Sequence, residues 1–200
     1  MNRSKLRIPT PAGHTETLVN DPQEDRRGLV FVGHPHPLHG GSMDNKVVQT
    51  VAQAAYERGW VAVRPNFRGV GASDGHYDGG IGETADMLAL IDFVAGHYPG
   101  LPLHLAGFSF GAYVQQRVAQ SRAAHSLALI GAAINLYDFG PAAPATRVIH
   151  GERDEIVPLA AVRAWTAAQD LPLTVVAQAN HFFDRKLGEL RAAVEAAWRS

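Results

Sequence analysis

The sequence contains no cysteine among its 200 residues. Disulfide bonds, thiolate zinc sites and a cysteine nucleophile are therefore excluded, and any covalent catalysis must use another side chain. A strong charge of either sign is also lacking, since the formal net charge is −1. Because no long-range field attracts polyanions, we expect neither nucleic acid nor a membrane surface as a partner.

Long apolar runs are missing as well. No segment approaches the roughly 20 apolar residues that span a bilayer, and no apolar signal-peptide core follows the polar, basic residues 1–10. We therefore expect a cytoplasmic protein. The composition, 46% hydrophobic and 18% charged, is typical of a globular chain, and its length suits a single domain over residues 1–200.

Short apolar runs rich in β-branched residues alternate with helix-length segments. The runs are too short for buried helices and predict buried strands. They cover residues 28–33, 60–64, 103–107, 126–130, 147–151 and 173–177, and helices are expected to start near Asp44, Glu83, Ser109, Pro158 and Arg185. This alternation predicts an α/β fold, in which a mainly parallel sheet carries helices on both faces. A turn at residues 9–13 is expected to join two further short strands.

Ser109 lies in the pattern G-F-S-F-G, directly after an apolar strand and before a helix-compatible segment. This is the context of a nucleophile elbow, in which a strained strand-to-helix turn exposes a serine hydroxyl. Gly107 and Gly111 leave that turn free of crowding side chains. We therefore predict Ser109 as a catalytic nucleophile, with an ordinary glycine-rich turn as the alternative.

A serine nucleophile requires a base and an orienting carboxylate, which in this type of fold follow it in the order acid, histidine. Asp154 lies just past the predicted strand 147–151 and is expected to be the acid, with Glu152 and Glu155 as neighbouring alternatives. Of the ten histidines, His181 alone lies in a loop that follows a late strand and comes after Asp154. We expect His181 to be the base.

Residues 34–46, H-P-H-P-L-H-G-G-S-M-D-N-K, follow the first buried strand, where an oxyanion loop belongs. Acyl transfer places negative charge on the carbonyl oxygen, which two preorganised N–H groups stabilise. Phe110, directly after the predicted nucleophile, supplies one. Because Pro35 and Pro37 have no N–H, His36 is the nearest second donor. We therefore expect an oxyanion hole made by the backbone amides of His36 and Phe110, with a plain turn as the alternative.

The same segment also has the histidine spacing of the His-x-His-x-Asp-His motif of metallo-β-lactamase-type hydrolases. Leu38 occupies the aspartate position, between His36 and His39, and an apolar side chain cannot bind a metal. The chain offers no strongly spaced further ligand set. We therefore expect no metal site.

A glycine-rich segment at residues 66–75 resembles a dinucleotide loop only superficially. Asp74 occupies the third glycine position, and the next helix is expected only near Glu83, so no helix N-terminus faces a pyrophosphate. We expect no cofactor, and we interpret Arg68 as a structural hydrogen-bond donor.

Four segments together resemble the α/β-hydrolase superfamily, most closely small bacterial members related to dienelactone hydrolases. They are residues 34–46, 66–75, 107–111 and 150–154 with 181–183. The resemblance implies a triad of Ser109, His181 and Asp154, no cofactor, and carboxylic esters or related small acyl substrates. Ser109 stands where true dienelactone hydrolases have cysteine, so their substrate is not carried over.

Many members of that superfamily carry a lid, but here only about a dozen residues join Ala132 to Thr146. We therefore expect a lidless protein with an exposed, shallow site and modest substrate discrimination. The expected activity is that of a serine esterase that forms an acyl-enzyme. An acyltransferase or peptidase would use the same triad, and a binding protein of the same fold would lack turnover.

Overall fold

The short apolar runs form strands of one sheet in the computed structural model, which describes residues 2–199. The strands are β1 (Asn2–Thr10), β2 (Gly13–Asp21), β3 (Gly28–Gly33), β4 (Trp60–Pro65), β5 (Leu103–Phe108), β6 (Ser126–Ile130), β7 (Thr146–Gly151) and β8 (Leu173–Val176). The helices are α1 (Lys46–Glu57), α2 (Ile81–His97), α3 (Phe110–Ser121), α4 (Leu159–Ala167) and α5 (Leu187–Ala197), with a 3-10 turn, η1, at Pro37–His39.

The sheet has the order β1-β2-β4-β3-β5-β6-β7-β8. β1 and β2 form an antiparallel hairpin, and β2 also pairs antiparallel with β4. Every pair from β4 to β8 is parallel. The predicted α/β class with a mainly parallel sheet is confirmed. The hairpin strands are nine residues each, longer than the short pieces expected around the turn at residues 9–13.

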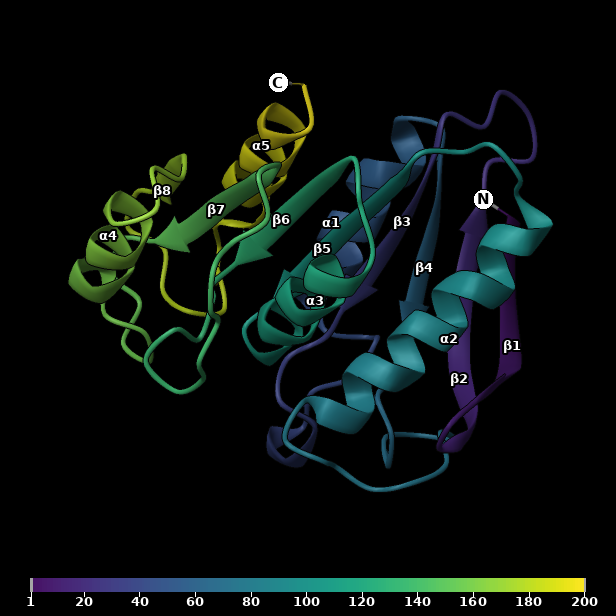
Figure 1. The fold of residues 1–200 in the computed structure, drawn as a ribbon. Coiled ribbons are helices and arrows are strands. Elements are labelled where there is room, and N and C mark those ends of the chain that lie inside the picture. Colours follow the sequence, from purple (N-terminus) through teal and green to yellow (C-terminus); the bar gives the residue numbers. More distant parts are fainter. Residues whose placement is uncertain (1, 200) are drawn as a thin grey trace.

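Helices cover both faces of the sheet (Figure 1), with α2, α3 and α4 on one face and α1 and α5 on the other. In β3, Leu29 and Phe31 pack toward the first group of helices, whereas Val30 and Val32 pack toward the second. All six residues of β3 are buried, because a parallel strand between two helical layers has no solvent-facing side. This is why its sequence reads as a continuous apolar run.

Helix α2 begins at Ile81, two residues before the expected start at Glu83. The fully buried Glu83 carboxylate accepts hydrogen bonds from the backbone amides of Asp78, at 2.9 Å, and Gly80, at 2.8 Å. A helix leaves its first N–H groups without intrahelical partners, and an acidic residue in the first turn stabilises that end. Glu83 therefore lies inside the helix and satisfies amides that precede it.

The connection between β6 and β7 holds neither a helix nor a strand in the described chain, and the expected absence of a substantial lid is confirmed. Buried Phe139 fixes this connection against the body of the protein. Its ring lies 5.5 Å from that of Tyr113 on α3 and 5.7 Å from that of Trp165 on α4. Within residues 2–199, none of the helices has the length and apolar character needed to cross a membrane.

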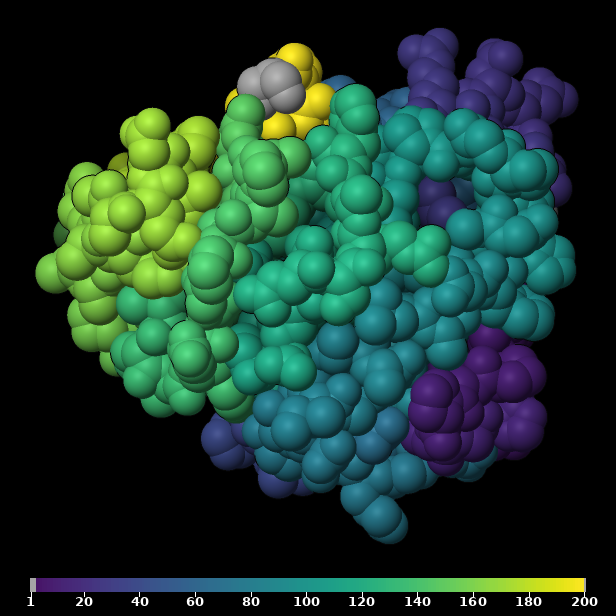
Figure 2. Space-filling view, viewed as in Figure 1, coloured from purple at the N-terminus to yellow at the C-terminus, as the bar shows by residue number. Residues whose placement is uncertain are grey.

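The hairpin turn is fixed against the segment that follows β4. The amide of Ala12 donates to Asp86 Oδ1 at 2.9 Å, and the amide of Asp74 donates to the His14 carbonyl at 2.9 Å. Figure 2 shows this contact from outside, where the purple hairpin turn lies against the blue-teal segment. The hairpin forms one edge of the sheet, and its turn is held against the loop after β4 and helix α2.

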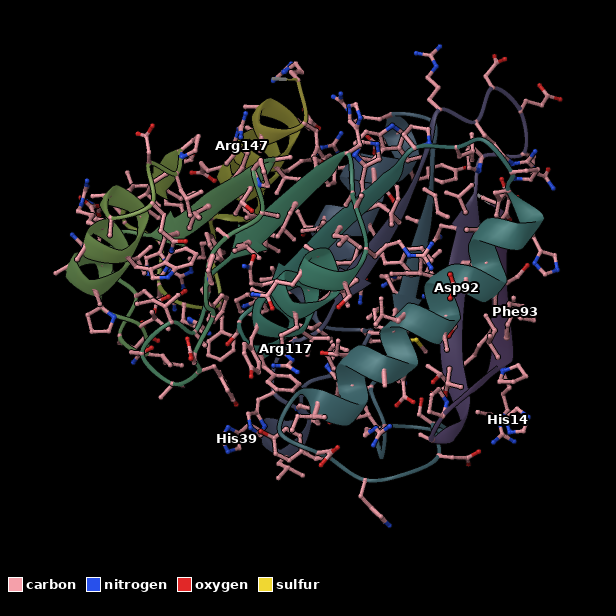
Figure 3. All side chains as sticks on the ribbon, in the orientation of Figure 1. His14, His39, Asp92, Phe93, Arg117 and Arg147 are labelled. Carbon is pink, nitrogen blue, oxygen red and sulfur yellow. The ribbon has the colours of Figure 1, made fainter. Side chains whose placement is uncertain are left out.

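The carboxyl ends of the parallel strands lie along one edge of the sheet, where open α/β sheets bind their ligands. Loops after β3, β5, β7 and β8 all emerge there. Figure 3 shows His39, from η1, beyond this edge, while Asp92 and Phe93 mark helix α2 on the covering layer.

Candidate active site

Ser109 occupies the turn between β5 and α3 with a backbone φ of 56° and ψ of −115°. A positive φ is costly for a residue with a side chain and persists only where the surroundings enforce it. Here the Ser109 amide donates to the Ile130 carbonyl at 2.9 Å, and the Ser109 carbonyl accepts from the amide of Ala112 at 3.0 Å. These bonds hold the turn in the strained conformation, with the serine side chain partly accessible.

Two glycines permit this turn by close backbone contact. A Cβ atom on Gly107 would lie 2.2 Å from the Gly111 carbonyl oxygen. A Cβ atom on Gly111 would lie 2.3 Å from the carbonyl oxygen of Gly33, at the end of the neighbouring strand β3. The strand and helix backbones therefore meet at distances that only glycine allows.

The structure brings together Ser109, His181 and Asp154, which come from the loops after β5, β8 and β7. His181 Nε2 lies 3.1 Å from Ser109 Oγ, and His181 Nδ1 lies 2.7 Å from Asp154 Oδ2. Since an ionised carboxylate only accepts hydrogen bonds, Nδ1 carries the proton in this pair. The Nε2 atom of a neutral His181 then faces the serine hydroxyl as an acceptor.

The Asp154 carboxylate is buried and fully hydrogen-bonded. Its Oδ1 accepts from the amides of Ile156, at 2.9 Å, and Val157, at 2.7 Å. Burial acts to raise the pKa of Asp154, but the hydrogen bonds from His181 and Val157 outweigh it and hold the pKa below its usual value. Asp154 is therefore a fixed carboxylate that faces His181.

The two alternative acids occupy other positions. Glu152 is exposed, and its Oε2 accepts from the backbone amide of Gln178 at 2.8 Å. Glu155 is also exposed and accepts from the backbone amide of His181 at 3.4 Å, a contact that does not involve the imidazole ring. Of the three carboxylates, Asp154 is the one bonded to the ring nitrogen.

His150 is a buried neighbour of this group that the sequence did not single out. Its Nε2 lies 2.9 Å from the Val157 carbonyl oxygen and 3.5 Å from Asp154 Oδ2. Burial lowers the pKa of His150, which favours the neutral ring. The Val157 amide thus donates to Asp154, and the Val157 carbonyl accepts from His150. These three residues therefore form one hydrogen-bonded cluster. The position of His150 at the end of a strand, four residues before Asp154, is the signal that points to it.

His36 and Phe110, whose amides are expected to form an oxyanion hole, both line the cleft that also contains Ser109. In the described residues, neither the His36 amide nor the Phe110 amide donates a hydrogen bond to protein. The His36 carbonyl accepts from the amides of His39, at 3.1 Å, and Gly41, at 3.0 Å, so the loop is folded tightly around this residue. Gly40 supports that fold with a φ of 77°.

The cleft above Ser109 has a volume of about 290 Å³. Its rim carries exposed apolar side chains, since Leu136 is 60%, Ile156 is 40% and Phe182 is 37% accessible. Among the described residues that line it, none is Asp, Glu, Lys or Arg. The cleft is therefore mainly apolar, and histidines are its only titratable side chains besides tyrosine among the described residues.

Aromatic rings form one wall of the cleft. The His36 ring stacks on that of His39 at 4.4 Å, and it lies 4.8 Å from Tyr77 and 5.4 Å from Phe110. Burial, together with the neighbouring His39, lowers the pKa of His36 and favours its neutral form. Rings at these distances stabilise one another and stiffen the wall.

His34, the first histidine of the metal-like motif, is not available as a ligand. Its ring is fully buried, with Nε2 accepting from the Phe67 amide at 2.9 Å and Nδ1 lying 2.7 Å from the Pro35 carbonyl oxygen. Both ring nitrogens are therefore used in backbone hydrogen bonds. Over residues 2–199, no cluster of His, Asp or Glu side chains has the arrangement of a metal site.

Arg68 has the structural role assigned to it from the sequence. Its Nε donates to Asp86 Oδ2 at 2.8 Å, and the other oxygen of Asp86 accepts from Ala12 in the hairpin turn. Arg68 therefore connects the loop after β4 to the hairpin through Asp86.

The mainly parallel sheet, the absence of a lid between β6 and β7 in the described chain, and the serine in the strained turn between β5 and α3 are together typical of an α/β hydrolase. A family model described as "Serine aminopeptidase, S33" matches residues 27–172. An α/β serine hydrolase without a lid from Xanthomonas campestris is similar at 38% identity, with a TM-score of 0.94 over 100% of this chain and 94% of that one. An α/β serine hydrolase homologue from Coxiella burnetii has 36% identity and a TM-score of 0.92 over 98% and 97% of the two chains.

An uncharacterised protein of Rickettsia prowazekii is 31% identical over 199 residues, which cover 92% of this chain and 84% of that protein. The chain belongs to the S33 family of serine hydrolases within the α/β-hydrolase superfamily. The closer relation to dienelactone hydrolases that the sequence suggests stays a prediction.

Replacement of His34 tests the neutral state of this buried ring. Burial lowers the pKa of His34 from 6.5 to about 4. Because the folded-state pKa is depressed, the associated stability is complete above pH 6.5 and is lost as the pH falls toward 4. The difference corresponds to about 3 kcal/mol. We expect the free energy of unfolding in urea to fall less over this window in His34→Gln, whose amide can replace both hydrogen bonds, than in the unmodified protein.

The exposed His97 provides the control for this measurement, because His97→Gln removes a histidine without disturbing a buried ring. Its pH profile is expected to parallel that of the unmodified protein. Identical slopes for His34→Gln and the unmodified protein would contradict the assignment.

Proposed function

We propose that the protein is a carboxylic ester hydrolase in which Ser109, His181 and Asp154 form a catalytic triad. The single observation that carries the proposal is the hydrogen-bonded chain from Ser109 Oγ through His181 to Asp154 Oδ2, at 3.1 Å and 2.7 Å. These distances are within the reach that proton transfer requires. The order serine, acid, histidine along the chain is the order of this fold.

In the proposed mechanism, Ser109 Oγ attacks the acyl carbon while His181 Nε2 accepts its proton. Asp154 remains ionised and stabilises the imidazolium, and its bonds to Ile156 and Val157 hold it in place. His181 then returns the proton to the departing alkoxide, which leaves an acyl group on Ser109. A water molecule, deprotonated by His181, attacks that ester, and His181 passes the proton to the departing Ser109 Oγ, which releases the acid and restores the free serine.

The amides of His36 and Phe110 are proposed to hold the negative charge on the acyl oxygen. Two observations support this assignment. Both residues line the cleft with Ser109, and neither amide is hydrogen-bonded to the described protein. The Phe110 amide also lies in the first turn of α3, where the helix dipole favours negative charge. An oxyanion donor of this kind typically contributes about 3 kcal/mol to the transition state.

The lining of the cleft favours a neutral ester over the free peptide N-terminus that an aminopeptidase must hold. An α-ammonium group is recognised by a carboxylate, and no Asp or Glu within residues 2–199 lines the cleft. The apolar rim at Leu136, Ile156 and Phe182 instead fits an uncharged acyl group. The open, lidless cleft gives water access to the acyl-enzyme, which favours hydrolysis over transfer to another acceptor. The expected cytoplasmic location stays a prediction.

Removal of the proposed nucleophile gives the first test. In Ser109→Ala, we expect kcat/KM for p-nitrophenyl butyrate to fall by roughly 10⁴-fold or more, because no other hydroxyl in residues 2–199 is hydrogen-bonded to the His181 ring. The matched control is Ser121→Ala, which removes an exposed serine at the far end of the same helix. Turnover by Ser109→Ala at the unmodified rate would show that the triad assignment is wrong.

A matched pair of substrates separates an esterase from an aminopeptidase-like site. We compare the p-nitrophenyl esters of alanine and N-acetylalanine, which differ in whether an α-ammonium is present. Because no carboxylate of the described residues lines the cleft, we expect the acetylated ester to have the higher kcat/KM after subtraction of spontaneous hydrolysis, by about tenfold, or 1.4 kcal/mol. A preference for the free ammonium in a Ser109-dependent reaction would instead support aminopeptidase activity.

A further inference from the structure

Arg64, on β4, is a buried arginine with no carboxylate within salt-bridge distance among the described residues. Only 4% of it is exposed, and its Nε has no hydrogen-bond partner there. Its Nη1 donates to the Met43 carbonyl at 2.9 Å, and its Nη2 lies 3.5 Å from Asn20 Oδ1. A guanidinium stays charged in proteins, and a buried charge is costly unless it is paired.

Arg68, four residues further along the chain, is a partly buried arginine whose charge is paired. It bonds Asp86 at 2.8 Å, and that ion pair holds the pKa of Arg68 above its usual value. Arg64 has the opposite environment, because burial and the like charge of Arg3 lower its pKa and outweigh the opposing effect of the Asp44 carboxylate. The positive charge of Arg64 is therefore not neutralised in the way that the charge of Arg68 is.

A cavity of about 110 Å³ adjoins Arg64, between helix α1 and the face of strands β1, β2 and β4. We call it the Arg64 cavity, and it is lined by Arg3, Asn20, Gln49, Ala52, Gln53 and Arg64. A water molecule occupies about 30 Å³ of liquid, so the cavity has room for a small polyatomic ligand. Exposed Arg3 and Gln49 border it, so it is reached from solvent.

We propose that the Arg64 cavity binds a small oxyanion of the carboxylate, sulfate or phosphate class. Arg64 and Arg3 supply two positive charges, and guanidinium groups match the oxygen spacing of such anions. Gln49 and Gln53 each retain a second N–H beyond their bonds to the Asp44 carbonyl and to Glu57. Among the described residues that line the cavity, the charged ones, Arg3 and Arg64, are both positive, and the two glutamines add hydrogen-bond donors.

The Asp44 carboxylate lies near this site, where it would compete with a bound anion for Arg3. Asp44 Oδ1 is 3.9 Å from Arg3 Nη2, and both side chains are more than half exposed. An ion pair in solvent of this kind is weak, so a bound anion can replace Asp44 as the partner of Arg3. Asp44 does not line the cavity and forms no ion pair with Arg64 in the described residues.

The Arg64 cavity lies behind the loop that forms one wall of the catalytic cleft. Arg64 donates to the Met43 carbonyl, and the Met43 amide donates to Asn66 Oδ1 at 2.8 Å. Gly41 and Asn45, on either side of Met43, border the cleft. The proposed anion site is thus separate from the cleft and is lined by different residues.

Calorimetric titration of the full chain with phosphate, sulfate and acetate tests the proposal. Ionic strength is held constant, and the three anions distinguish which oxyanion the cavity accepts. We expect saturable binding of at least one anion with a stoichiometry of one. Arg3→Gln should weaken it by about tenfold or more, because it removes one of the two charges. Gln53→Leu should weaken it by a smaller factor.

The matched control is Arg7→Gln, which removes the same charge from the same strand, where Arg7 faces Asp74 rather than the cavity. Its affinity is expected to equal that of the unmodified protein. Both arginines are exposed, so neither variant threatens the fold. The proposal is overturned if no anion binds saturably, if Arg3→Gln binds as tightly as the unmodified protein, as it would for an anion in the oxyanion hole, or if Arg7→Gln loses as much affinity as Arg3→Gln.

Discussion

The close approach of three backbones at the end of β5 is the constraint on which the rest of the site depends. Gly107 and Gly111 let strand β3, strand β5 and helix α3 meet where a Cβ atom on either glycine would collide with a carbonyl group. That contact fixes the strained φ of Ser109 and directs its hydroxyl toward His181. The same contact places the first turn of α3 beside the loop after β3, and so brings the two proposed oxyanion donors to one cleft.

The other half of the site rests on hydrogen bonds to a buried carboxylate. Asp154 has no freedom to rotate, because both of its oxygens are engaged by His181 and by the amides of Ile156 and Val157. His150 extends this arrangement to the strand itself. Strain in the serine turn and fixed geometry at the acid both favour preorganisation, in which the groups are aligned before a substrate arrives.

The sequence predicted the parallel part of the fold well, because strands buried on both faces, such as residues 28–33, read as continuous apolar runs. The loops that carry Ser109, Asp154 and His181 were found through glycine pattern and strand order. Features that depend on tertiary contacts were not predicted from the sequence. Arg64 lies inside a strand, where a polar residue gives no sign of its partners, and the one signal for His150 is its place near a strand end, four residues before Asp154. Helix α2 begins two residues before the expected start, because Glu83 lies inside its first turn and accepts hydrogen bonds from amides that precede the helix.

Mass spectrometry of the reacting protein tests the nucleophilic role of Ser109, on which the proposed mechanism depends. The protein is mixed with p-nitrophenyl butyrate, quenched in acid during turnover and digested. We expect a butyryl group on the peptide that contains Ser109, and its disappearance once the substrate is consumed. Turnover with that peptide unmodified at every quench time, or a butyryl group on another residue that forms and decays at the rate of turnover, would contradict it.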